Sequence, residues 1–252
     1  MAQEQTSRNS GLQAWSAVLL RLTAFPAPSA EFAEQNWWLE VVGDKPARRQ
    51  EEPRKAMRRE DGPFAKANLT LISQPQRIDW VYKSTEEYEP IGQFTEALDQ
   101  FIPTMKRWLE SAPPILRLAF GATLIIPPEN RESGYRILSS FLRTVQIDPK
   151  NSSDFAYQIN RPRPAKTKII GLSLNRLCKW SVIQLNETQI TVDSVGRSVA
   201  NLPSKVSYFC ELTLDLNTAA EFQAEIPNGQ LTKLLDELVA LGQEIASEGD
   251  IP

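Results

Sequence analysis

The chain of 252 residues contains no histidine. This absence removes the imidazole that most often serves as a general base and that completes serine–histidine and cysteine–histidine catalytic pairs. It also removes the commonest zinc ligand, and the two cysteines, Cys178 and Cys210, do not have the spacing of a zinc site. The sequence therefore excludes histidine-dependent enzymes and the usual zinc proteins.

Glycine is scarce and scattered along the chain. The eleven glycines form neither a phosphate-binding loop that ends in Lys and Ser or Thr nor a G-x-G-x-x-G dinucleotide motif. The sequence consequently predicts no nucleotide-dependent activity of the standard kinds, and we expect no cofactor.

Long apolar runs are also missing. The longest, near 14–20 and 118–126, fall short of the roughly 18–20 residues that cross a bilayer. Segment 1–12 is polar and lacks the order of a secretory signal, so we expect a flexible tail. We expect a cytoplasmic protein that does not bind membranes, whose two cysteines are buried thiols. With a net charge of −3, the whole molecule would not attract nucleic acid.

Apolar patterning predicts an α+β fold, with a mostly antiparallel sheet and amphipathic helices packed on one face. Strands are predicted over 13–25, 69–73, 77–82, 115–126, 155–160, 168–174, 179–185, 189–192 and 206–216. Segments 168–174 and 179–185 are either two strands or one long bent strand. Helices are predicted over 29–42, 93–111, 129–145 and 229–246. After the tail, we divide the chain into an N-terminal lobe, 13–149, and a C-terminal lobe, 150–252. Each has strands followed by an amphipathic helix, which leaves open whether the lobes are similar.

Two of these segments have distinctive patterns. Segment 13–25 is apolar at both alternating sets of positions, which predicts a strand covered on both faces. Helix 93–111 carries apolar residues at a period of 3.6, with Pro103 inside it. We expect Pro103 to kink this helix, because proline removes a backbone hydrogen bond.

Segment 44–63 combines three prolines, Pro46, Pro53 and Pro63, with dense charge of both signs. We predict a long charged loop without any helix of more than about two turns. Its candidate binding residues are Arg48, Arg49, Arg54 and Arg58. The acids between them favour a solvated loop over a phosphate-binding arm.

A second basic segment contains Arg161, Arg163, Lys166 and Lys168, with Pro162 and Pro164 between them. Alternating arginine and proline favour an extended chain that displays guanidinium groups to phosphates or to an acidic partner surface. A solubilising turn is the competing interpretation. If the segment binds RNA, Arg176 and Lys179 would assist it.

Trp37 and Trp38 are adjacent in a predicted helix, where successive side chains point about 100° apart. One could pack in the core while the other anchors an interface, since aromatic residues are favoured there. The alternative is a wide core contact near the helix end.

Carboxylates are the remaining candidates for catalysis. Asp79 and Asp215 lie in predicted strands, and a magnesium site or a hydrolytic pair would need two such acids close together. Acids on a solvated strand face are the competing interpretation.

The order of elements resembles an uncharacterised, sporadically distributed bacterial family of about this length. The resemblance rests on the opening strand, the central strand–helix–strand stretch, and a late strand that ends Leu214-Asp215-Leu216-Asn217-Thr218 before a closing helix. It implies no activity and transfers no functional residue.

These observations favour a non-enzymatic binding or accessory protein within a larger protein assembly, of a bacterial regulatory or defence kind. RNA binding through 161–179 and a carboxylate- or metal-dependent enzyme are the alternatives. The sequence does not determine the oligomeric state.

Overall fold

The computed structural model describes residues 15–28, 36–167, 169–187, 190–192, 198–200 and 205–251. The predicted N-terminal tail lies outside these residues, and so does Lys168 of the second basic segment. No helix in the described part of the chain is long and apolar enough to cross a membrane.

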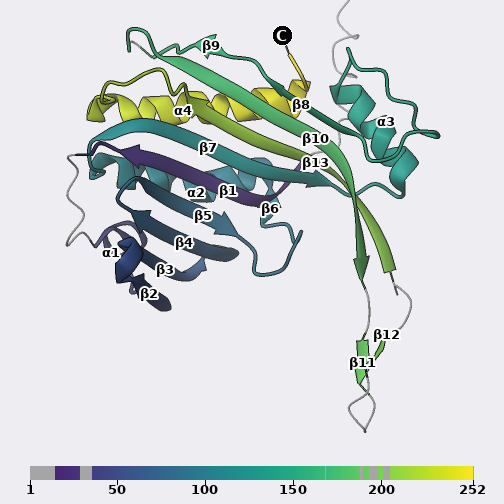
Figure 1. Ribbon diagram of the computed structural model, residues 1–252, viewed down its shortest axis with the longest axis horizontal. Coiled ribbons are helices and arrows are strands. Elements are labelled where there is room, and N and C mark those ends of the chain that lie inside the picture. The colour runs from purple at the N-terminus through teal and green to yellow at the C-terminus, as the bar shows by residue number, and fades with distance from the viewer. Residues whose placement is uncertain are drawn as a thin grey trace, which may run out of the picture.

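Eleven strands form one antiparallel sheet (Figure 1). They are β1 (Ser16–Pro26), β2 (Arg48–Glu52), β3 (Met57–Phe64), β4 (Ala67–Gln74), β5 (Arg77–Lys83), β6 (Gly92–Gln93), β7 (Ile115–Ile126), β8 (Ala156–Asn160), β9 (Arg163–Pro164), β10 (Ser173–Glu187) and β13 (Lys205–Thr218). The order across the sheet is β2-β3-β4-β5-β1-β7-β13-β10-β8, with β6 beside β1 and β9 beside β10. A separate pair is formed by β11 (Ile190–Val192) and β12 (Ser198–Ala200). The prediction of an α+β fold with a mostly antiparallel sheet is confirmed.

Four helices are described: α1 (Trp37–Val42), α2 (Phe94–Glu110), α3 (Arg131–Phe141) and α4 (Asn228–Glu248). Each lies close to its predicted place, although 29–35 of the helix predicted over 29–42 lie outside the described residues. Gly43 ends α1 in the left-handed conformation, with φ of 84°, which glycine adopts without the steric cost of a side chain. Pro103 lies inside α2, which continues without a break through it.

The strand predictions are largely confirmed by the pairing. β4 and β5 pair down to Gln74 opposite Arg77, which leaves a two-residue turn at Pro75 and Gln76. Of the two possibilities for 168–174 and 179–185, the structure has the single long strand, β10, which begins at Ser173. β7 pairs with β1 on one side and with β13 on the other, so both halves of the chain contribute to one sheet.

The predicted loop over 44–63 is wrong, because β2 and β3 form an antiparallel hairpin there. A three-residue 3₁₀ turn, Pro53–Lys55, joins the strands and is the only helical piece in this segment, which agrees with the predicted limit on helix length. Glu60 is fully buried, 3.3 Å from Arg58 Nε and 3.9 Å from Arg49 Nη1. The sequence pattern predicted that these charged side chains lie in solvent, whereas in the structure they form ion pairs within the hairpin.

The helices and the sheet bury a continuous apolar core. α2 contacts β1, α4 contacts β7 and β13, α3 contacts β10 and β13, and α2 and α4 contact each other. In Figure 1, α2 and α4 lie behind the strands. Cys210 shares the inward face of β13 with Leu212 and Leu214, and it contacts Gly134 of α3. α3 therefore packs on the same side of the sheet as α4.

Trp37 and Trp38 are both about 1% exposed, so neither is a surface anchor. Trp37 meets Trp108 of α2 edge to face at 6.0 Å, and Trp38 stacks on Trp80 of β5 at 6.2 Å. Trp80 and Trp108 are themselves 6.0 Å apart. The short helix α1 lies where α2 meets β5, and both of its tryptophans therefore reach the same aromatic cluster.

We predict that Trp108→Ala lowers the free energy of unfolding by about 3–5 kcal/mol, because a fully buried indole leaves a cavity that the cluster cannot fill. Urea unfolding followed by circular dichroism measures this loss. Leu39→Ala, at a side chain 41% exposed on α1, is the control and should cost under about 1 kcal/mol. An unchanged unfolding midpoint for Trp108→Ala would contradict the packing.

Candidate functional site

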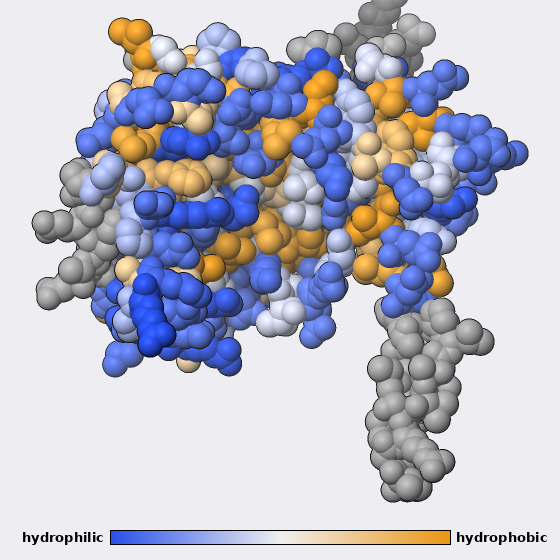
Figure 2. All heavy atoms as spheres, in the orientation of Figure 1, coloured by the Kyte–Doolittle hydropathy of each residue, from blue (hydrophilic) through white to orange (hydrophobic). Residues whose placement is uncertain are grey.

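One face of the sheet has no helix over it in the described part of the chain. We call it the open face, and Figure 1 looks onto it. The register places these outward residues on neighbouring strands: Arg77, Asp79 and Val81 on β5; Leu19, Arg21, Thr23 and Phe25 on β1; Arg117, Ala119, Gly121 and Thr123 on β7; Thr213, Asp215 and Asn217 on β13; Asn175, Leu177 and Lys179 on β10. Figure 2 shows apolar and polar side chains interspersed on this side of the molecule.

A hydrogen-bonded cluster joins β1 and β5 on the open face. Thr23 donates its hydroxyl proton to Asp79 Oδ1 at 2.5 Å, and Arg77 donates to both carboxylate oxygens of Asp79 at 2.6 and 3.0 Å. The hydrogen bond to Asp79 is the main reason that the pKa of Arg77 is raised. The guanidinium groups of Arg77 and Arg117 lie 5.9 and 5.1 Å from the ring centroid of Phe25. This arrangement fixes two cations beside an aromatic ring.

A second polar network continues across β7, β13 and β10. Arg117 donates to the backbone oxygen of Thr218 at 3.3 Å and to Asn217 Oδ1 at 3.5 Å. Asn217 also accepts from Asn175 at 3.0 Å and donates to Asp215 at 3.1 Å. The side chains of Arg117, Asn175, Asp215 and Asn217 are therefore held by their neighbours.

Arg21 differs from the other arginines of this face. It lies opposite Gly121 of β7, and a Cβ atom at Gly121 would be 3.4 Å from both Nε and Nη2 of Arg21. The guanidinium therefore lies over the backbone of β7. Its Nε is buried without a hydrogen-bond partner, and no carboxylate of the described residues lies within 4.0 Å of its nitrogens.

The two carboxylates proposed for catalysis, Asp79 and Asp215, both lie on the open face. Their strands are three positions apart in the sheet, so their backbones are separated by about 14 Å. This exceeds the roughly 5–9.5 Å of a hydrolytic carboxylate pair. In the described part of the chain no group of three or more acidic or cysteine side chains could hold a metal ion.

The second basic segment lies elsewhere, against the end of α4. Arg161 donates to both oxygens of Asp250 at 2.7 and 2.8 Å, and Tyr157 donates its hydroxyl proton to Asp250 at 2.9 Å. The pKa of Asp250 is lowered chiefly by the hydrogen bond from Arg161. Arg176 donates to the backbone oxygen of Ile251 at 3.1 Å. These hydrogen bonds hold Asp250 and Ile251, which follow α4, against β8 and β10.

The rest of that segment also contacts α4. Arg163 lies 3.5 Å from a carboxylate oxygen of Glu244, and the backbone N–H groups of Lys166 and Thr167 donate to Glu237 at 2.7 and 3.1 Å. Lys179 lies on the open face, and the register places Arg48 on the same face, since it pairs with Asp61, which is continuous with Thr70 and Val81. Arg48 and Arg54 are exposed on the hairpin of β2 and its turn.

Sequence reasoning did not identify Arg21, Phe25, Arg117 or Asn217. The apolar pattern of 13–25 predicts a strand covered on both faces, and this is wrong for the described residues, because only one face of β1 lies under a helix. The available signal was Arg21, a single charge within an otherwise apolar strand.

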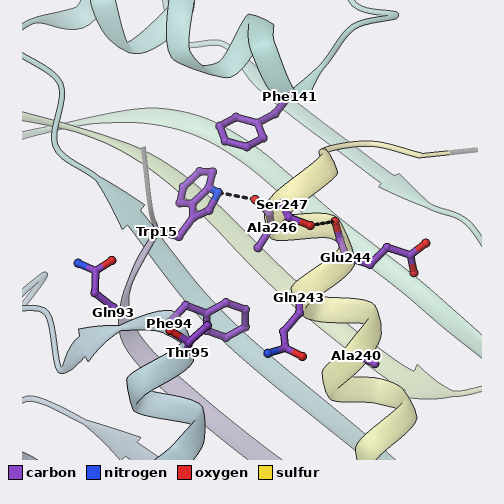
Figure 3. Close-up of a pocket in the computed structure, with 10 residues that line it drawn as sticks. All are labelled: Trp15, Gln93, Phe94, Thr95, Phe141, Ala240, Gln243, Glu244, Ala246 and Ser247. Carbon is purple, nitrogen blue, oxygen red and sulfur yellow. Dashed lines mark hydrogen bonds between the residues drawn. The ribbon is translucent and has the colours of Figure 1, made fainter. Parts of the chain in front are cut away.

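A cavity of about 530 Å³ lies on the helix side, away from the open face. Figure 3 shows its aromatic walls, Trp15, Phe94 and Phe141, and the last turns of α4. The indole N–H of Trp15 donates to the backbone oxygen of Ala246 at 2.9 Å, and its ring lies 5.3 Å from that of Phe141. These contacts fasten β1 to α3 and α4.

Comparisons with protein-family models, with curated proteins and with solved structures find no match for this chain. The resemblance to a bacterial family in the order of elements stays a prediction. Function is accordingly argued from the geometry of the open face.

We predict that Arg161→Ala lowers the melting temperature by a few degrees at pH 7, since the buried carboxylate of Asp250 loses its cation. The folded-state pKa of Asp250 is depressed, so its contribution is present above the unfolded value of about 3.9 and is lost as the pH falls through the lowered pKa. The difference between the two proteins should shrink in that range.

Thermal melts between pH 7 and pH 3 measure this effect. Arg54→Ala, at an exposed position, is the matched control and should melt like the wild type. A difference for Arg161→Ala that stays constant over this range would contradict the role assigned to the pair.

Proposed function

We propose that this chain is a non-enzymatic accessory protein that binds a protein partner through its open face. One observation carries the proposal: no helix of the described residues covers this face, although apolar side chains such as Leu19, Phe25 and Val81 lie among its arginines. Aromatic residues and arginine are enriched at protein interfaces. An uncovered surface of mixed apolar and polar character is typical of an interaction site.

The shape of the open face also supports a macromolecular partner. Small-molecule sites are usually concave pockets, whereas the outward residues of the open face are spread over five neighbouring strands of the sheet. A protein surface can contact such an area at once, and a small ligand cannot.

The ribbon of β10 and β13 supplies a second contact region. The pairing of β13 with β7 ends at Cys210 and that of β10 with β8 ends at Ser181, yet β10 and β13 continue to pair as far as Glu187 and Lys205. The ribbon therefore projects beyond the sheet (Figure 1), and Val206 on it is 46% exposed. Two-stranded ribbons are marginally stable alone, so a partner that packs on this one would stabilise it.

The setting of this partner interaction is part of the proposal. We propose an assembly of a bacterial regulatory or defence kind. Cys178 and Cys210 are both buried free thiols, and burial raises the pKa of each to about 12, which suits a reducing cytoplasm. We interpret 13–149 and 150–252 as two lobes with helices on one face, which leaves the other face for the partner.

Nucleic-acid binding through 161–179 has less support. Arg161 and Arg163 already contact Asp250 and Glu244, and these acids would repel a phosphate backbone. A carboxylate-dependent reaction is likewise less supported, given the distance between Asp79 and Asp215.

The proposal is tested by size-exclusion chromatography of a lysate of the source cells that contains a tagged copy of the chain. Val81→Asp and Leu177→Asp place a charge among the half-buried apolar residues of the open face. We expect the wild type to elute with a partner and each variant to lose at least about ten-fold in affinity, because truncation or charge at an interface centre costs over about 1.4 kcal/mol.

Leu39→Asp is the control, because Leu39 is exposed on α1, away from the open face. Equal melting temperatures would show that the variants fold. Elution of the wild type as a free monomer only, or retention of the complex by both open-face variants, would rule out the proposal.

A further inference from the structure

The guanidinium of Arg21 lies over Gly121 on the open face, and no carboxylate of the described residues pairs with its charge. Its Nε–H is buried and unpaired, although buried donors are nearly always satisfied. A guanidinium presents a planar fork of donors that matches the two oxygens of a carboxylate. The Nε–H faces Gly121 and is closed to solvent, whereas Arg21 as a whole is only half-buried. An acceptor from outside the described residues therefore meets the guanidinium at its Nη nitrogens.

Gly121 provides the space for this contact. Glycine weakens a strand, and inside one it often marks a place where another group approaches closely. Here the guanidinium of Arg21 lies over Gly121, and the neighbouring outward residues of β7, Ala119 and Thr123, are small. Because these neighbours are short, they leave the guanidinium of Arg21 accessible to another molecule.

The acids of the open face do not satisfy Arg21, because they have other partners. Asp79 accepts hydrogen bonds from Thr23 and Arg77, and Asp215 accepts one from Asn217. Both acids still place negative charge on this face. A multiply charged phosphate or a nucleic-acid backbone would be repelled more strongly than a single carboxylate.

We propose that Arg21 is the receptor for an aspartate or glutamate side chain of the protein partner, which docks over Gly121. The inference rests on the proposed function and names the partner's chemistry. The apolar neighbours Leu19 and Val81 lie beside Arg21 on the open face and suit an acidic residue flanked by aliphatic ones. Arg117, whose acceptors are the neutral groups of Asn217 and Thr218, extends the positive charge toward β13.

The test follows the arginine Nε–Hε resonances of the whole protein by nuclear magnetic resonance during titration with three probes. The probes are the peptide acetyl-Leu-Val-Glu-Val-Leu-amide, its glutamine analogue and inorganic phosphate. We expect the glutamate peptide to shift the Arg21 resonance saturably, and the glutamine analogue and phosphate to bind at least ten-fold more weakly.

Arg21→Lys keeps the charge and removes the fork, so it should weaken binding of the glutamate peptide at least ten-fold, whereas Arg54→Lys should leave it unchanged. Equal binding of the glutamine analogue, equal or tighter binding of phosphate, or unchanged affinity in Arg21→Lys would overturn the inference. A cellular complex that survives Arg21→Lys but is lost in Val81→Asp would overturn the carboxylate inference alone. Elution of the wild type as a monomer only would end the proposed function, and the peptide titration would still decide the role of Arg21.

Discussion

The antiparallel pairing of β7 with β1 and β13 is the constraint on which the rest of the structure depends. β7 carries the register from the N-terminal strands to the C-terminal ones, so a single sheet runs through both halves of the chain. The helices α2, α3 and α4 bury one face of that sheet. No helix of the described residues covers the other face, and polar side chains from Asp79 to Asn175 hydrogen-bond to their neighbours there.

Because no helix of the described residues covers the open face, charged groups there make hydrogen bonds and ring contacts with neighbouring side chains. Arg77 and Arg117 are tied to neighbours and to the ring of Phe25, which holds the outward surface in a fixed arrangement. Fixed side chains lose less conformational entropy when a partner binds. The proposed partner would therefore meet a surface whose side chains are already held in place.

The spacing of apolar residues along the chain predicted most of the helices and strands, but it did not predict the residues of the open face. β7 and α2 were found with nearly their observed bounds, because buried strands and amphipathic helices leave a periodic signal in the sequence. Segment 44–63 was missed because its two strands are held by ion pairs such as that of Arg58 with Glu60, which give no apolar period. The position of Arg21 over Gly121 depends on pairing between residues about a hundred positions apart, and local sequence carries no record of that register. The basic side chains of Arg161 and Arg163 do not lie on the open face for a similar reason, since Arg161 pairs with Asp250, 89 positions later in the chain.

Hydroxyl-radical footprinting of the chain, alone and in its purified complex, would show whether the open face is the binding surface. If it is, Leu19, Phe25 and Val81 should lose reactivity in the complex. Leu39 and Ile170, exposed by 41% and 97% and lying off the open face, should react equally in both states. Protection of Leu39 and Ile170 with unchanged reactivity of the open-face residues would contradict binding through this face.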